Sequence, residues 1–88
     1  GETMLKVSLA NGKCEEFKPY NLNEISVILK TMAKQNPYEV HPIYLSHDKQ
    51  LFWNVIKYFG SCTQALRILF EPAVGNSIII SWAYLGKD

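Results

Sequence analysis

The sequence predicts an α+β fold: a two-layer sandwich in which a mostly antiparallel sheet of four to five strands carries two helices on one face. Three observations support this prediction. The chain opens with an alternating apolar pattern around Asn11-Gly12, continues with two segments of helical apolar spacing, and closes with two strongly apolar runs. The resulting order is β-β-α-(β)-α-β-β, which is typical of a sheet with helices packed on one side.

The opening hairpin is predicted from a period of two and a turn signal. A two-residue turn at Asn11-Gly12 would put Phe17 on the opposite face from Val7. A three-residue loop with a bulge at Gly12 instead sets Leu5 opposite Phe17. We favour the bulged loop because it gathers the apolar side chains on one face, and a register slip of one residue would reverse every face.

The first helix is predicted over residues 22–34. Asn21 is a good N-cap, and Glu24 follows three residues later as in a capping box. Apolar residues then recur at helical spacing: Leu22, Ile25, Ile28, Leu29 and Met32. Asn36-Pro37 ends the helix.

The next segment, residues 38–45, is predicted to be extended. Proline lacks the backbone N–H that a helix or a sheet ladder needs, so Pro37 and Pro42 argue against a regular helix here and interrupt most ladders. A short edge strand at residues 43–45 is the one regular element that we expect in it.

The second helix is predicted to begin after Ser46 as its N-cap, with Asp48 in its first turn, and to end at Gly60. One broad apolar stripe marks the side that faces the core: Leu51, Phe52, Val55, Ile56 and Phe59. Trp53 and Tyr58 point away from this stripe.

Two strands are predicted to close the chain. Residues 65–70 alternate in polarity, residues 72–76 supply turn formers, and residues 77–85 contain three consecutive isoleucines. A continuous apolar run is typical of a strand that is buried on both faces. In a two-layer domain one of those faces is open, so the outer face of the last strand is a candidate interface.

The composition indicates one small globular domain over residues 1–88, which we expect to be part of a larger protein. Hydrophobic residues make up 48% of the chain, which excludes intrinsic disorder. Cys14 and Cys62 lie in no CxxC pair, and we expect reduced, partly buried thiols in an intracellular protein, cytoplasmic or nuclear. We see no signal peptide and no transmembrane segment of about 20 apolar residues.

The sequence contains no motif that indicates an enzyme. The P-loop and the GxGxxG, HExxH and GxSxG motifs are all missing. The two histidines, His41 and His47, are most simply surface residues, and no two carboxylates are paired by local geometry. We therefore expect no catalytic residue, no metal and no cofactor. A small or accessory enzyme that uses His41, His47 or Cys62 is kept as an alternative.

The function we predict is a non-enzymatic protein-interaction or scaffold domain. Its partner would be another protein or a second copy of the chain, the latter through an unpaired sheet edge. Aromatic residues make up 12% of the chain, and large rings are common at binding hot spots. The candidate protein-binding residues lie on the second helix and the last strand: Trp53, Tyr58, Ile79, Trp82 and Tyr84.

Nucleic-acid binding is a less favoured alternative. Aromatic residues on an open sheet could stack on bases, as they do in RRM domains. However, nine basic residues meet eight acidic ones, and no RNP1-like run occurs. Lys30 and Lys34 form a small basic face on the first helix, which we interpret as solvated.

The run Leu51–Phe59, which follows His41-Pro42, resembles a segment in the C-terminal region of type-4 DENN-domain proteins. In that segment a His-Pro precedes an aromatic-Trp-Asn-aliphatic-aliphatic-x-Tyr-Phe run, with a shorter spacing than here. The proteins of that family are exchange factors for Rab GTPases in membrane traffic. The resemblance transfers no site residue, because the exchange activity of that family resides in another domain. At the fold level, the opening hairpin and helix also resemble a ubiquitin-like β-grasp, our alternative fold.

Overall fold

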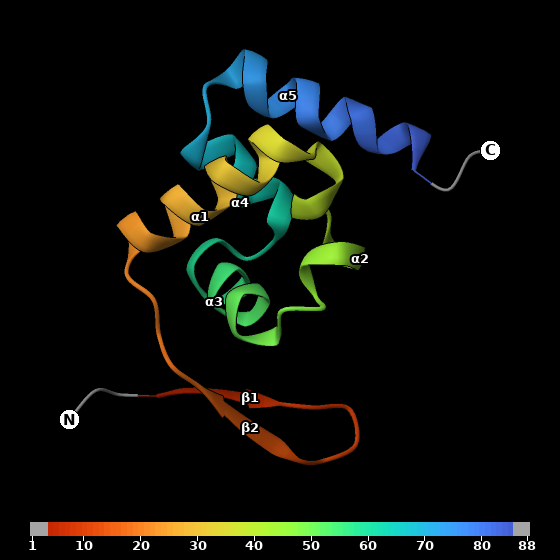
Figure 1. Ribbon diagram of the computed structural model, residues 1–88. Coiled ribbons are helices and arrows are strands. Elements are labelled where there is room, and N and C mark those ends of the chain that lie inside the picture. Colours follow the sequence, from red (N-terminus) through yellow and green to blue (C-terminus); the bar gives the residue numbers. More distant parts are fainter. Residues whose placement is uncertain (1–3, 86–88) are drawn as a thin grey trace.

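The computed structural model describes residues 4–85, and this part of the chain is mostly helical (Figure 1). In chain order its elements are β1 (Leu5–Ser8), β2 (Cys14–Phe17), α1 (Leu22–Gln35), the 3-10 helix η1 (Pro37–Val40), α2 (Pro42–Leu45), α3 (Lys49–Phe59), α4 (Cys62–Leu69), α5 (Pro72–Ser81) and the 3-10 helix η2 (Trp82–Tyr84). The strands of the described residues form a single two-stranded sheet. The predicted sandwich with a four- to five-stranded sheet is therefore wrong, and so is its β-grasp alternative.

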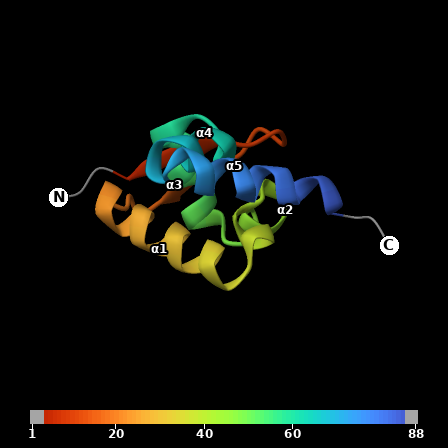
Figure 2. The same cartoon turned by 90° about the horizontal axis from the view of Figure 1, so that it is seen from above.

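The elements are stacked from the hairpin to the last helix. Figure 1 shows the β1–β2 hairpin at one end, α3 above it, α1 and α4 in the middle, and α5 at the other end. Helix α4 packs against both α3 and α5, and η1 packs against α1, α2 and α5. Seen from above in Figure 2, α5 crosses the top of the domain as its outermost helix.

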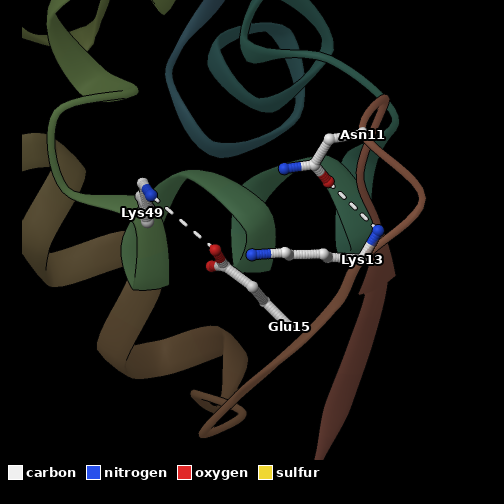
Figure 3. Close-up of polar contacts among 4 residues, drawn as sticks. All are labelled: Asn11, Lys13, Glu15 and Lys49. Carbon is white, nitrogen blue, oxygen red and sulfur yellow. Dashed lines mark hydrogen bonds and ion pairs between the residues drawn. The ribbon is translucent and has the colours of Figure 1, made fainter.

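The hairpin has the predicted register. Leu5 pairs with Phe17, and the backbone N–H of Leu9 donates to the Lys13 carbonyl at 2.8 Å across a loop of three residues. Gly12 takes a φ of 83°, which glycine adopts without strain. Within the loop, the Asn11 side-chain oxygen accepts from the Lys13 N–H at 3.0 Å (Figure 3). This register confirms the predicted bulged loop. The sequence could indicate it because the geometry of such a loop depends only on neighbouring residues.

Helix α1 begins where predicted. The Asn21 Oδ1 accepts from the Glu24 N–H at 2.8 Å, and the Asn21 Nδ2 donates to the Glu24 Oε1 at the same distance. The cap satisfies one of the amide groups that the first turn of a helix leaves unpaired.

The predicted extended segment at residues 38–45 is wrong, because the two prolines begin helical turns instead of preventing them. Proline is favoured at the first position of a helix, where its missing N–H has no partner to lose. Pro37 opens η1 and Pro42 opens α2. The residue before each proline is the cap: Asn36 Oδ1 accepts from the Tyr38 N–H at 3.0 Å, and His41 Nδ1 accepts from the Ile43 N–H at 3.1 Å.

Helix α3 is confirmed as a helix, with a different N-cap. The Asp48 Oδ1 accepts from the Leu51 N–H at 3.2 Å, whereas the Ser46 hydroxyl donates back to the Ile43 carbonyl at 3.0 Å. Gly60 ends the helix with a φ of 90°, as predicted.

The two closing strands are wrong as well, because residues 62–69 and 72–81 are helical. The Ser61 hydroxyl caps α4 by accepting from the Gln64 N–H at 3.1 Å, and Pro72 opens α5. The residues predicted to form a turn before the last strand thus lie inside α5. Alternation over six residues and a short apolar run do not separate a strand from a buried helix.

The core lies between the helices, and α1 to α5 together with η1 contribute to it. Its buried hydrophobic residues are Ile25, Leu29, Val40, Leu45, Leu51, Val55, Cys62, Ala65, Leu66 and Ile78. The hairpin adds one buried residue, Val7, and an ion pair between Glu15 and Lys49 of α3, whose nearest N and O atoms lie 3.8 Å apart (Figure 3). The hairpin therefore packs at the edge of a domain whose core is formed by the helices.

Candidate functional site

The side chains that could have supported catalysis are engaged in local structure. His41 uses its Nδ1 atom to cap α2, and its ring lies edge-on to Trp82 with centroids 4.8 Å apart. Cys62 is buried in the core, and this burial raises the pKa of its thiol to about 11. Among residues 4–85, no three His, Cys, Asp or Glu side chains come together in a way that could hold a metal ion.

The two cysteines should react very differently with thiol reagents. Cys14 is exposed and free, whereas Cys62 is buried and free. With a pKa of about 11, only about one thousandth of the Cys62 thiol is ionised at pH 8, and the thiolate is the nucleophile. Titration of the native protein with Ellman's reagent at about pH 8 should label one thiol rapidly and the second only in denaturant. A Cys14→Ser variant should lose the rapid phase, and two rapid equivalents from the native wild type would contradict this burial.

The five residues predicted to bind a protein do not form one surface. Trp53 and Tyr58 lie on α3, whereas Ile79 lies on α5 and Trp82 and Tyr84 lie on η2. Figure 1 shows α3 beside the hairpin and α5 at the opposite end of the domain. Of the five, Ile79 is partly buried against the core, and Tyr84 is the most exposed, at 65%.

Trp82 has a structural role. Its Nε1 donates to the Pro37 carbonyl at 3.0 Å, and its ring packs against His41 and the core. These contacts fasten the end of α5 to η1. On α3, the Tyr58 hydroxyl similarly donates to the Tyr20 carbonyl at 2.7 Å. Rings of this kind hold elements together, so replacing them would disturb the fold as well as a binding surface.

Sequence reasoning missed Asn54, which is the one polar residue fully buried in the described part of the chain. Its Oδ1 accepts from the Tyr20 N–H at 2.7 Å, and its Nδ2 donates to the carbonyls of Lys18 and Gln50 at 3.0 and 2.7 Å. The amide joins the segment before α1 to α3. The available signal was an asparagine between the apolar and aromatic residues Leu51–Trp53 and Val55–Ile56.

The outer side of α5 and η2 is unusually apolar. Ala73, Ser77, Ile80 and Tyr84 recur at the spacing of one helix face, and Val74 lies beside them. We call these five residues the α5 face. Ile80 is 66% exposed, Tyr84 65% and Val74 46%, although all three carry large hydrophobic side chains.

A groove runs along the α5 face, between α5 and the second half of α1. Its volume is about 450 Å³. The floor is mostly apolar, and the α1 wall contributes two lysines. The lining residues are Lys30, Ala33, Lys34, Phe70, Ala73, Val74, Ser77 and Ile78. This groove and the adjoining α5 face are the candidate functional site.

No family model matches this chain, and neither a curated protein nor a solved structure is significantly similar to it. The resemblance of residues 51–59 to type-4 DENN-domain proteins stays a prediction. No helix among residues 4–85 has the length and apolar character needed to cross a bilayer.

Proposed function

We propose that this domain is a non-enzymatic protein-interaction domain that binds another protein through the α5 face. The observation that carries the proposal is the position of α5. A helix that is apolar on all sides is normally buried on all sides. Helix α5 is close to this case, because its only polar side chains are those of Asn76, Ser77 and Ser81. It is nevertheless the outermost helix of the domain, and only two of its residues, Gly75 and Ile78, are buried (Figure 1). A partner on the outer side would cover the apolar side chains that the domain itself leaves in water.

The other functions considered find less support at this site. Use of His41 as a catalytic base is disfavoured because its Nδ1 already accepts a backbone N–H. Nucleic-acid stacking on a sheet is disfavoured because Trp82 and Tyr84 belong to a 3-10 helix. The free, exposed thiol of Cys14 supports an intracellular location, where such thiols stay reduced.

Site-specific photo-crosslinking in cells of the source organism would test the proposal. A photoreactive amino acid in place of Ile80 should give one discrete adduct with another protein. The same amino acid in place of Ile68 of α4 is the matched control, because Ile68 is an equally large residue, 61% exposed, that belongs neither to the groove nor to the α5 face. Equal adducts from both positions, or none from position 80, would refute the α5 face as a binding surface.

The purified partner then allows the affinity to be measured by calorimetry. Ile80→Ser and Tyr84→Ser should each weaken binding about tenfold or more, since an apolar side chain buried at an interface contributes about 1.5–3 kcal/mol. Ile68→Ser should leave the dissociation constant unchanged. All three positions are exposed, so circular dichroism should show a native fold for each variant.

A further inference from the structure

The charges of the groove lie on one wall. Lys30 and Lys34 are one helical turn apart on α1 and therefore project side by side. No carboxylate lines the groove. Within residues 4–85, the ion pair between Lys49 and Glu15 is the only one, so neither groove lysine has a carboxylate partner there. The groove therefore offers two unpaired positive charges beside an apolar floor.

The apolar part of the site is long and narrow. Ala33, Phe70 and Val74 are among the apolar residues that line the groove, and the α5 face continues past it to Ile80 and Tyr84. From residue 73 to residue 84 a helix rises by about 16 Å. An apolar strip of this length matches about three turns of a second helix, whose anchors recur at helical spacing.

We propose that the groove and the α5 face bind an acidic amphipathic helix of the partner protein. This inference rests on the proposed function, and it adds the chemistry of the partner. The helix would lay its apolar side chains against Phe70, Val74 and Ile80. Its carboxylates, one turn apart, would pair with Lys30 and Lys34. Pairing across the rim would select acidic partners and set the direction in which the helix lies.

A long-chain fatty acid has the same combination of an apolar body and a negative charge, but it fits the site less well. Ligand pockets enclose most of the surface of a small molecule. Ile80 and Tyr84 lie beyond the groove and are highly exposed. An acyl chain lying against them would be covered on one side only and would stay half in water. A helix of a folded partner keeps its own far side covered or polar, so this geometry favours the helix.

Two synthetic peptides of about 15 residues, roughly four helical turns, provide the test. Both carry leucine on one helix face; the acidic peptide has glutamate beside the leucines, and the basic peptide has lysine at the same positions. Fluorescence anisotropy with the full chain should show binding of the acidic peptide alone. Its affinity should fall when NaCl is raised to about 0.5 M, because salt screens exposed ion pairs.

Charge reversal gives the decisive comparison. Lys30→Glu with Lys34→Glu should weaken the acidic peptide about tenfold or more, which corresponds to about 1.4 kcal/mol, and should create binding of the basic peptide. Lys6→Glu with Lys57→Glu makes the same change in net charge at exposed positions outside the groove, and it should change neither affinity.

Four results would overturn the inference. Binding of both peptides to the wild type would show that the site has no preference for acidic helices. If Ile80→Ser then abolished the binding of both peptides, the α5 face would remain the binding surface of the proposed function, without selection for an acidic partner. Binding of neither peptide would reject the helix, while the crosslinking result at position 80 would still decide the proposed function. If sodium oleate, and neither peptide, changed the NMR chemical shifts of the Lys30 and Val74 amides, the site would be a fatty-acid site. A dimer by light scattering that Ile80→Ser converts to a monomer would identify a second copy as the occupant.

Discussion

Replacing Asn54 by leucine should lower the free energy of unfolding by about 3 kcal/mol, because buried polar groups that lose their partners keep their full cost of desolvation. Leucine has the same number and branching of side-chain heavy atoms as asparagine, so the change leaves no cavity. The change removes three hydrogen bonds at once and leaves the Tyr20 N–H and the Lys18 and Gln50 carbonyls without this partner. Urea unfolding followed by circular dichroism gives the measurement.

The matched control for this change is Asn76→Leu, at an exposed asparagine of α5. Surface substitutions usually change the free energy of unfolding by less than about 0.5 kcal/mol. Hydrogen exchange adds a local readout, since the Tyr20 amide should be protected in the wild type and should exchange rapidly in Asn54→Leu. If the two leucine variants were equally stable, the buried amide would not join the segment before α1 to α3.

The second large effect is expected at Gly75, where α5 crosses α4. A Cβ atom at this position would lie 3.0 Å from the Leu66 carbonyl oxygen and 3.7 Å from the Phe70 Cβ. In an exposed helix, Gly→Ala stabilises by about 1 kcal/mol. Here the backbone of α4 would have to move, so Gly75→Val should destabilise the protein by about 2–3 kcal/mol through overpacking.

Asn76→Val is the control for this series, because it places the same β-branched side chain on the neighbouring exposed position of α5. It should cost only the small helix-propensity difference, a few tenths of a kcal/mol. Gly75→Ala should fall between the wild type and Gly75→Val in thermal unfolding. A Gly75→Ala protein about 1 kcal/mol more stable than the wild type would mean that α5 does not approach α4 so closely.

The elements that could be predicted depend on residues near one another in the sequence. Asn21 and Glu24 form a cap within four residues, and Gly60 ends α3 with a positive φ. The register that pairs Leu5 with Phe17 depends on a loop of three residues. Each of these features is decided by hydrogen bonds or backbone torsion over a short stretch of chain, so the residues themselves indicate it.

The elements that were predicted wrongly depend on packing. Residues 65–70 alternate in polarity, which favours a strand. The same segment also fits a helix, because Cys62, Ala65 and Leu66 lie at helical spacing and form the buried side of α4. The isoleucines of residues 78–80 favour a strand by local propensity, yet they belong to a helix that Pro72 opens and that Gly75 fits against α4. The prolines at residues 37 and 42 were treated as interruptions, although both stand at positions where a helix tolerates them.

The candidate site divides in the same way. Tyr84 was expected at a binding surface and is highly exposed, whereas Trp82, expected beside it, bonds to the Pro37 carbonyl 45 residues away. Lys30 and Lys34 are exposed, in agreement with the solvated face that the sequence indicates, and the sequence does not show that they line a groove beside α5.

The sequence by itself determined the hairpin and its register, the first two long helices, and the absence of recognisable catalytic motifs. Only the tertiary structure decided that the closing apolar runs are helices, that Asn54 is a buried joint, and that the lysines of α1 border an apolar groove. The physical reason is the distance along the sequence between the residues that interact. Caps and turns are completed within a few residues, whereas burial and grooves arise where distant segments meet, and local propensity yields to that packing.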